Sequence, residues 1–325
     1  MKTMKWLLKR ELWEHKGALV WAPVIAAALM LVLITTTTLW GVAQGGFHGE
    51  VTFDGEHKTL GAAFSAMPAP EKAKAVAIIT NAYMVPSGPL FFMMAIITLF
   101  YCIASMYDER RDRSILFWKS LPVSDAETVL SKLLIATVVA PLITIVTAIA
   151  FSLALVLIGG VVLAMYGVNA IGPVLGSGQF YLLPLQVLGL LPIFALWALP
   201  TVGWMMLVSA WAKSKAFLWA IGLPIVFLAV VAWINYMLGN VIDMDWVQEN
   251  IVGRGLGSLF PGSWFIANPF DPAQLDQFED GVGNTGMIFA KSWGVMATPQ
   301  MWGGIVAGAA MIFGAIRLRR WKDEG

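Results

Sequence analysis

Six long runs of apolar residues constrain the fold of this chain more than any other feature. They cover residues 18–42, 84–106, 133–165, 181–210, 217–239 and 300–316. A helix needs about 20 apolar residues to cross the hydrocarbon core of a bilayer, so each run is long enough, or nearly so. No Asp, Glu, Lys or Arg falls inside any run, and only 13% of all residues are charged, against about 25% in soluble domains. We therefore expect an all-α polytopic membrane protein with six transmembrane helices.

Two of the runs contain residues that interrupt helices. The third run has a weak point at Gly159 and Gly160. The fourth run contains Pro184, Pro192 and Pro200, and proline removes a helical hydrogen bond and kinks or breaks the helix. We expect the fourth span to be kinked or broken.

The distribution of basic residues predicts the orientation of the chain in the membrane. The segments on the N-terminal side are 1–17, 107–132, 211–216 and 317–325, and they hold 16 of the 21 Lys and Arg residues. The segments on the other side are 43–83, 166–180 and 240–299, and they hold the remaining 5. Since basic residues concentrate in cytoplasmic loops, both termini are expected in the cytoplasm.

Residues 1–17 have the pattern of an amphipathic interfacial helix. Met4, Leu8 and Leu12 line one face, with Leu7 beside them. The charged residues are expected to face water: Lys5, Lys9, Arg10, Glu11 and Glu14. The alternative is a positively charged anchor for the first span. The apolar run that follows is too long for a secretory signal, so we expect it to be retained.

The two long extracytoplasmic segments differ in composition. In 43–83 we expect a short helix over 71–82, after Pro68 and Pro70. In 240–299 the apolar stretch 257–266 is expected to dip back into the membrane or to pack at its outer edge.

The sequence gives little sign of chemistry carried by this chain itself. It has no G-x-x-x-x-G-K-[ST] phosphate loop, no H-E-x-x-H and no G-x-S-x-G, and its one cysteine is Cys102. A group of polar residues in segment 43–83 can be interpreted in two ways, as a solvated loop or as a divalent-metal site on the outer surface. Its members are His48, Glu50, Asp54, Glu56 and His57. We favour the solvated loop and assign no metal or cofactor to this chain.

The segment 107–132 between the second and third runs is the most ordered of the cytoplasmic ones. A charged cluster over 108–113 leads into an amphipathic stretch over 114–121, which Pro122 ends. Ser124 and Glu127 have the S-x-x-E spacing of a capping box, which predicts the start of the next helix. A short helix on the cytoplasmic face, followed by a new helix start, suits contact with a soluble partner.

With this segment, the chain resembles the membrane subunits of type-2 ATP-binding-cassette (ABC) export permeases over essentially its whole length. In that family an acidic and basic cluster precedes a turn of the form L-x-x-x-P-[VI]-[ST] and a lysine that opens the third span. The matching residues here are 108–111, Leu116 to Ser124, and Lys132. The Gly-Thr that often follows the acidic cluster is replaced by Arg113 and Ser114.

The resemblance implies a partner and a mechanism. Two permease subunits, identical or not, would pair in a bacterial plasma membrane, and each would dock a separate ATPase subunit that holds ATP and Mg²⁺. Residues 108–121 would form a coupling helix that passes the motion of the ATPase to the spans. The candidate coupling residues are Asp108, Glu109, Arg110, Arg111, Arg113, Phe117 and Trp118. Alternatively, these charges only enforce topology.

Other functional classes stay open. An ATPase-linked membrane anchor or assembly factor without transport would share these features. A secondary transporter or channel is disfavoured because the runs contain no charged residue, and a membrane-embedded enzyme because no catalytic constellation is visible. The aromatic and Met-rich spans suit an amphipathic or lipid-like cargo, and no nucleic-acid partner is expected. In the last run Gly304 and Gly308 form a G-x-x-x-G, which predicts close helix packing.

Overall fold

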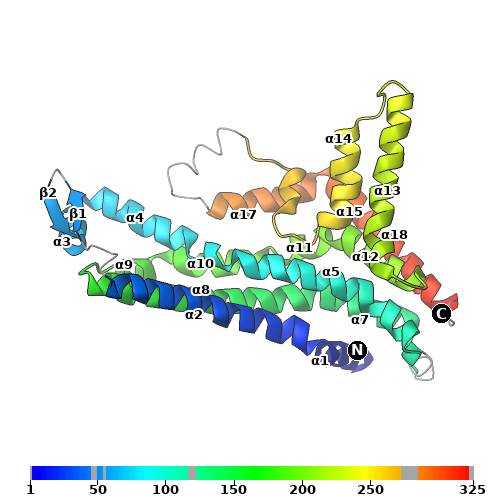
Figure 1. Ribbon diagram of the computed structural model, residues 1–325, viewed down its shortest axis with the longest axis horizontal. Coiled ribbons are helices and arrows are strands. Elements are labelled where there is room, and N and C mark those ends of the chain that lie inside the picture. The colour runs from blue at the N-terminus through cyan, green and yellow to red at the C-terminus, as the bar shows by residue number, and fades with distance from the viewer. Residues whose placement is uncertain (1, 45–49, 54–55, 116–121, 272–284, 322–325) are drawn as a thin grey trace.

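The part of the chain that the structure describes is almost entirely helical, and six of its helical stretches are long and apolar enough to cross a membrane. The structure, a computed structural model, describes residues 2–44, 50–53, 56–115, 122–271 and 285–321 (Figure 1). The six stretches are Gly17–Ala43, Ala69–Arg111, Asp125–Met165, Gly178–Trp197, Ala216–Met237 and Pro299–Trp321. Their number confirms the prediction of six apolar spans and indicates a multi-pass membrane protein.

The first half of the chain forms three of these stretches. Its elements are α1 (Lys2–Glu14), η1 (Gly17–Trp21), α2 (Ala22–Ala43), β1 (Glu50–Phe53), β2 (Glu56–Thr59), α3 (Leu60–Ala66), α4 (Ala69–Ala82), η2 (Val85–Ser87), α5 (Gly88–Arg111), α7 (Asp125–Leu134), η3 (Ile135–Val139) and α8 (Ala140–Met165). Here η marks short helices of the 3-10 or π type. The two strands form an antiparallel hairpin in which Glu50 is opposite Thr59.

The second half is divided into shorter helices. Its elements are α9 (Ile171–Gly176), α10 (Gly178–Gly189), α11 (Leu191–Trp197), α12 (Leu199–Trp211), α13 (Ala216–Met237), α14 (Met244–Val247), η4 (Gln248–Gly253), α15 (Arg254–Gly257), η5 (Ser263–Ile266), α17 (Thr285–Gly294), η6 (Val295–Ala297) and α18 (Pro299–Trp321).

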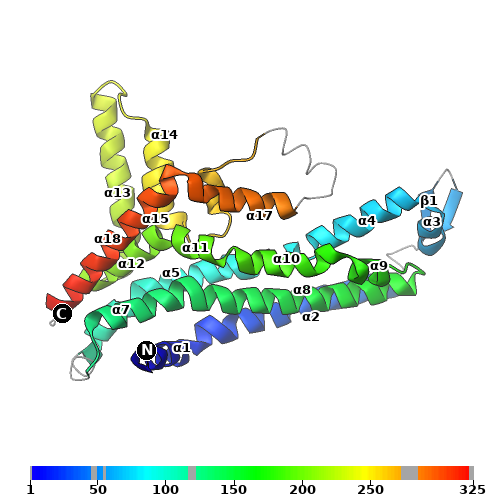
Figure 2. The same cartoon turned by 180° about the vertical axis from the view of Figure 1, so that it is seen from behind.

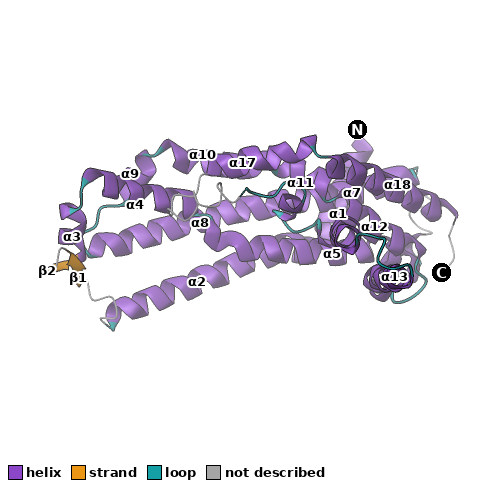
Figure 3. Ribbon diagram, turned by 90° about the horizontal axis from the view of Figure 1, so that it is seen from above, coloured by secondary structure: helices purple, strands orange, loops and turns teal. Residues whose placement is uncertain are grey.

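The helices form a long bundle from which a shorter arm extends. Helices α2, α5, α8 and α10 follow the long axis, whereas α13 and α14 project away from it (Figures 1 and 2). The β-hairpin lies at one end of the bundle, and α1, α7 and the last turn of α18 lie at the other (Figure 3). We call this second end, formed by α1, α7 and the last turns of α5 and α18, the basal end.

The predicted helix interruptions have different outcomes. The fourth run is interrupted at Leu190 and Ala198, so that Pro192 and Pro200 each occupy the first turn of a new helix, where proline is tolerated. Pro184 does not break the run, because α10 continues through it. The third run continues unbroken through Gly160, whose missing side chain leaves room for Ile171. The helical stretch Asp125–Met165 is about 60 Å long, twice the thickness of a hydrocarbon core.

The segments 43–83 and 240–299 contain the two features that the sequence predicted in them. The short helix expected over 71–82 is present as α4. The apolar stretch 257–266 packs on the spans, because Leu259 and Trp264 are buried in the main core. The indole Nε1 of Trp264 donates to Ser292 Oγ at 3.0 Å, which ties η5 to α17.

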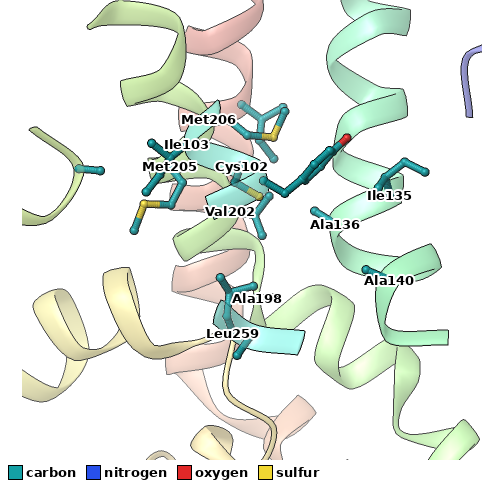
Figure 4. Packing of buried hydrophobic residues seen from close by; sticks show 14 of the residues in the cluster. Cys102, Ile103, Ile135, Ala136, Ala140, Ala198, Val202, Met205, Met206 and Leu259 are labelled. Carbon is teal, nitrogen blue, oxygen red and sulfur yellow. The ribbon is translucent and has the colours of Figure 1, made fainter. Parts of the chain in front are cut away.

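The main hydrophobic core lies where α5, α12 and α18 meet (Figure 4). Cys102 from α5 packs with Val202, Met205 and Met206 from α12. Helix α18 approaches α12 closely at Gly308, where an added Cβ would lie 2.6 Å from the carbonyl carbon of Leu199. The absence of a side chain at this position therefore allows the two helices to cross with their backbones nearly in contact.

Candidate functional site: the basal charge cluster

Helix α5 continues beyond the apolar run, so the charged cluster 108–111 forms its last turn. Asp108, Arg111 and Arg113 lie on the surface. In contrast, Glu109 and Arg110 are buried and bonded to other parts of this chain. The structure therefore divides the candidate coupling residues into an exposed group and an internal group.

The remaining candidates, Phe117 and Trp118, lie outside the described residues, as does most of the amphipathic stretch 114–121. The helix that follows begins as predicted. Ser124 Oγ accepts a hydrogen bond from the backbone N–H of Glu127, and the Glu127 carboxylate accepts one from the backbone N–H of Ser124. This reciprocal pair confirms the capping box at the start of α7.

Six charged side chains from four helices meet at the basal end, and we call them the buried charge cluster. They are Arg10 and Glu11 of α1, Glu109 of α5, Asp125 and Lys132 of α7, and Arg319 of α18. Lys132 Nζ lies 2.9 Å from Glu11 Oε1 and 3.0 Å from Glu109 Oε1. Arg319 Nη1 lies 2.6 Å from Glu109 Oε2, and its Nε lies 3.2 Å from Asp125 Oδ1.

Within the cluster three cationic side chains face three carboxylates, and Arg10 also pairs with the exposed Glu14 at 3.4 Å. Arg10 Nη2 completes the cluster at 3.4 Å from both Glu11 Oε1 and Glu109 Oε1. The hydroxyl of Tyr101 donates to Glu11 Oε2 at 3.1 Å, so both oxygens of this fully buried carboxylate are bonded. Removing one partner from such a network leaves an uncompensated buried charge, which costs several kcal/mol.

A second set of bonds fastens α5 to the end of α12. Arg110 Nη2 donates to the carbonyl oxygens of Ser209 and Ala212 at 2.6 and 2.8 Å. These carbonyls belong to the C-terminal end of α12, where helical acceptors lack partners and where a cation is favoured. Ser209 Oγ in turn accepts from the backbone N–H groups of Met106 and Tyr107. The last turn of α5 is therefore bonded to α1, α7, α12 and α18.

The exposed residues of the segment form a small charged surface. Arg111 Nη1 lies 3.3 Å from Asp108 Oδ1, and its Nε lies 3.1 Å from Asp112 Oδ1. Exposed ion pairs contribute little to stability, so these side chains can exchange partners at low cost. Arg113 has a φ of 57°, the left-handed conformation in which a helix commonly ends and which glycine adopts most easily. It stands where the family resemblance leads us to expect glycine.

The sequence did not predict the buried charge cluster. Glu11 was expected to face water, and this is wrong, because α1 docks on α5 and α7 with Glu11 at the centre of the contact. The helical spacing contained a signal, since Leu7, Leu8, Glu11 and Leu12 recur on one side of α1. The partners of Glu11 lie 90 and 121 residues away in the chain, so its pairing leaves no local pattern.

The metal hypothesis concerns His48, Glu50, Asp54, Glu56 and His57, whose side chains lie outside those that the structure describes. Among the described residues, no three His, Cys, Asp or Glu side chains come together as metal ligands. Comparison of the chain with protein-family models, curated proteins and solved structures finds no match.

Proposed function

We propose that this chain is the membrane-spanning permease subunit of an ABC exporter, which moves an amphipathic or lipid-like cargo outward across a bacterial plasma membrane. The basal end faces the cytoplasm. A separate ATPase subunit, which holds ATP and Mg²⁺, docks there on the segment after α5, and a second permease subunit completes the pore.

One observation carries this proposal beyond the sequence resemblance. The segment that would receive the ATPase begins at the most heavily bonded part of the basal end. A displacement of Asp108 or Arg111 moves Glu109, and Glu109 is joined to α7 by Lys132 and to α18 by Arg319. Motion at the docking surface is thereby passed to several spans at once, which is what coupling ATP hydrolysis to transport requires.

The division of the charged segment refines the roles of its residues. Arg111 and Arg113 are exposed, Asp108 is partly exposed, and all three act as partner contacts. Glu109 and Arg110 act inside the protein as the link between the docking surface and the spans. The same residues would serve an ATPase-linked anchor that does not transport, so binding and transport need separate measurements.

The test is affinity purification of the full chain from its native membrane in a mild detergent, with mass spectrometry of the proteins that accompany it. A stoichiometric phosphate-loop ATPase is expected. Arg111→Glu should reduce its recovery at least tenfold without reducing membrane insertion, because the substitution inverts an exposed docking charge. Arg317→Glu is the matched control, since Arg317 is an exposed arginine on α18 at the same end.

A preparation that never contains an ATPase would overturn the proposal and leave a standalone carrier or channel. If the ATPase is present but Arg111→Glu retains it at the wild-type yield, the docking assignment is wrong. Reconstitution with the ATPase then separates an exporter from an anchor, since only an exporter gives ATP-dependent movement of cargo across the vesicle membrane.

A further inference from the structure

A cavity of about 630 Å³ lies between α12, α13, α15 and α18, at a distance from the basal charge cluster. Ligand-binding cavities in proteins commonly measure about 300–1,000 Å³. Most of its wall is apolar, including Trp204, Leu223, Phe227, Trp246 and Met311. Arg254, the first residue of α15, is the one charged side chain among the described residues that line it.

Arg254 is buried without a compensating anion. Only 6% of it is exposed, and within the described part of the chain no carboxylate lies within 4.0 Å of its guanidinium. The guanidinium carbon lies 3.8 Å from the ring centre of Trp197, and Nη1 donates to the carbonyl of Gln300. Nε and Nη2 have no hydrogen-bond partner among the described residues.

The backbone around Arg254 is shaped to hold this side chain in the cavity wall. A Cβ at position 304 would collide with the guanidinium, so Gly304 provides the space that the head of Arg254 occupies. The backbone carbonyl of Arg254 accepts hydrogen bonds from the hydroxyls of Thr201 and Ser258 at 2.7 and 2.6 Å. This role of Gly304 differs from that of Gly308, which contacts the backbone of α12.

A purely structural role explains only part of this arrangement. Stacking on Trp197 and the bond to Gln300 fix α15 against α11 and α18, and an uncharged side chain could also fill this volume. The charge itself is costly, because a buried ion is normally paired with an opposite charge. A guanidinium with unused donors is suited to a carboxylate or a phosphate, which it binds through charge-assisted hydrogen bonds.

We propose that this cavity binds an amphiphile with an anionic head group, with the head at Arg254 and the alkyl chain along the apolar wall. The cavity opens at the surface beside Leu223, Phe227 and Trp246, which are 38%, 43% and 53% exposed. Leu223 and Phe227 belong to α13, an apolar candidate span, so a lipid tail can enter from the hydrocarbon side. Binding is a property of this chain alone and does not depend on an ATPase.

The test is native mass spectrometry of the purified full chain in a nonionic detergent, without any partner. Phosphatidylglycerol and phosphatidylcholine with the same acyl chains are compared with inorganic phosphate as the free anion. We expect the wild type to retain phosphatidylglycerol at least tenfold more tightly than phosphatidylcholine, and not to retain inorganic phosphate. Arg254→Gln should abolish this preference, and Arg254→Lys should preserve part of it.

Two further variants separate the cavity from general effects of charge and folding. Ala307→Phe fills the cavity and leaves Arg254 in place, so it should also abolish retention of phosphatidylglycerol. Arg317→Gln removes an exposed arginine outside the cavity and should leave the preference unchanged. The proposal is overturned if wild type and Ala307→Phe retain the lipid equally, if the wild type does not distinguish the two lipids, or if inorganic phosphate binds as well as the lipid.

Discussion

Arg319 and Arg254 are both almost fully buried, but their surroundings differ in one respect. At the basal end, Arg319 contacts the carboxylates of Glu109 and Asp125. In the cavity, Arg254 contacts an aromatic ring and a backbone carbonyl but no acid among the described residues. The first arginine is part of a closed network, whereas the second leaves a charge for a ligand to neutralise.

The presence or absence of a counter-ion indicates what a buried charge does in a membrane protein. A buried ion pair that is fully bonded acts as a lock between helices, because separating it exposes two charges to a poorly solvating environment. A buried cation without a counter-ion needs other partners. Arg110 has the two carbonyls at the C-terminal end of α12, whereas Arg254 has one carbonyl and leaves both Nε and Nη2 without a partner among the described residues. This contrast is the reason we propose transmission of motion for the basal charge cluster and ligand binding for the cavity.

The proposed difference between the two buried arginines is tested most directly by two matched substitutions, Arg319→Met and Arg254→Met. Arg319→Met leaves two carboxylates without their shared partner, so we expect a loss of about 3–5 kcal/mol in the free energy of unfolding. Arg254→Met loses a stacking contact but removes an unpaired charge, and the two effects should cancel to within about 1 kcal/mol. Unfolding in detergent, followed by circular dichroism, measures both. Equal losses in the two variants would show that Arg254 is as structural as Arg319.

A double-mutant cycle measures the coupling energy of one ion pair in the buried charge cluster, Glu11 with Lys132. Lys132→Met alone leaves Glu11 buried without its nearest cation, and Glu11→Gln alone leaves Lys132 with one carboxylate fewer. The double variant removes both members of the pair, so its loss should be smaller than the sum of the single losses by about 1–3 kcal/mol. The same cycle for the exposed pair Asp108 and Arg111 should give less than about 1 kcal/mol. Additive losses at the buried pair would contradict its role as a lock.

Two glycines on α18, one turn apart, compare the cavity with the helix crossing. In Gly308→Ala the new Cβ meets the backbone of Leu199, which cannot move alone, so we expect a loss of about 1–3 kcal/mol. In Gly304→Ala it meets the guanidinium of Arg254, the far end of a side chain that can shift without moving the backbone. The stability loss should therefore be smaller, and the displaced guanidinium should weaken lipid retention. Thermal unfolding and the lipid assay on both variants check this. A larger stability loss for Gly304→Ala than for Gly308→Ala would contradict the conclusion that Gly308 is the glycine required for the helix crossing.

The sequence predicted those parts of the structure that depend on local patterns. Apolar runs gave the six candidate spans, and prolines marked the breaks in the fourth one. The spacing of Ser124 and Glu127 identified the start of α7, because a capping box involves residues only three positions apart.

The two candidate sites could not be predicted in the same way. Glu109 and Arg319 are 210 residues apart. From the sequence alone, each would be interpreted as a charge at the end of a span. From the sequence alone, Arg254 would be interpreted as a loop residue. Its neighbours in the sequence do not indicate that η4 and α15 pack between α12, α13 and α18. Long-range packing decided both sites.

A third arginine, Arg113, is exposed at the basal end. Unlike Arg319 it is not part of the buried charge cluster, and unlike Arg254 it does not line the cavity. Its left-handed φ of 57° costs a residue with a side chain about 1 kcal/mol relative to glycine. Arg113→Gly should therefore raise the free energy of unfolding by about 1 kcal/mol. Asp112→Gly is the control, since Asp112 has a φ of −88° and glycine there should only destabilise. An unchanged or lower stability of Arg113→Gly would show that the arginine side chain makes contacts that offset its strain. If the variant is more stable but recovers less ATPase, the strained arginine is retained because its exposed guanidinium binds the partner.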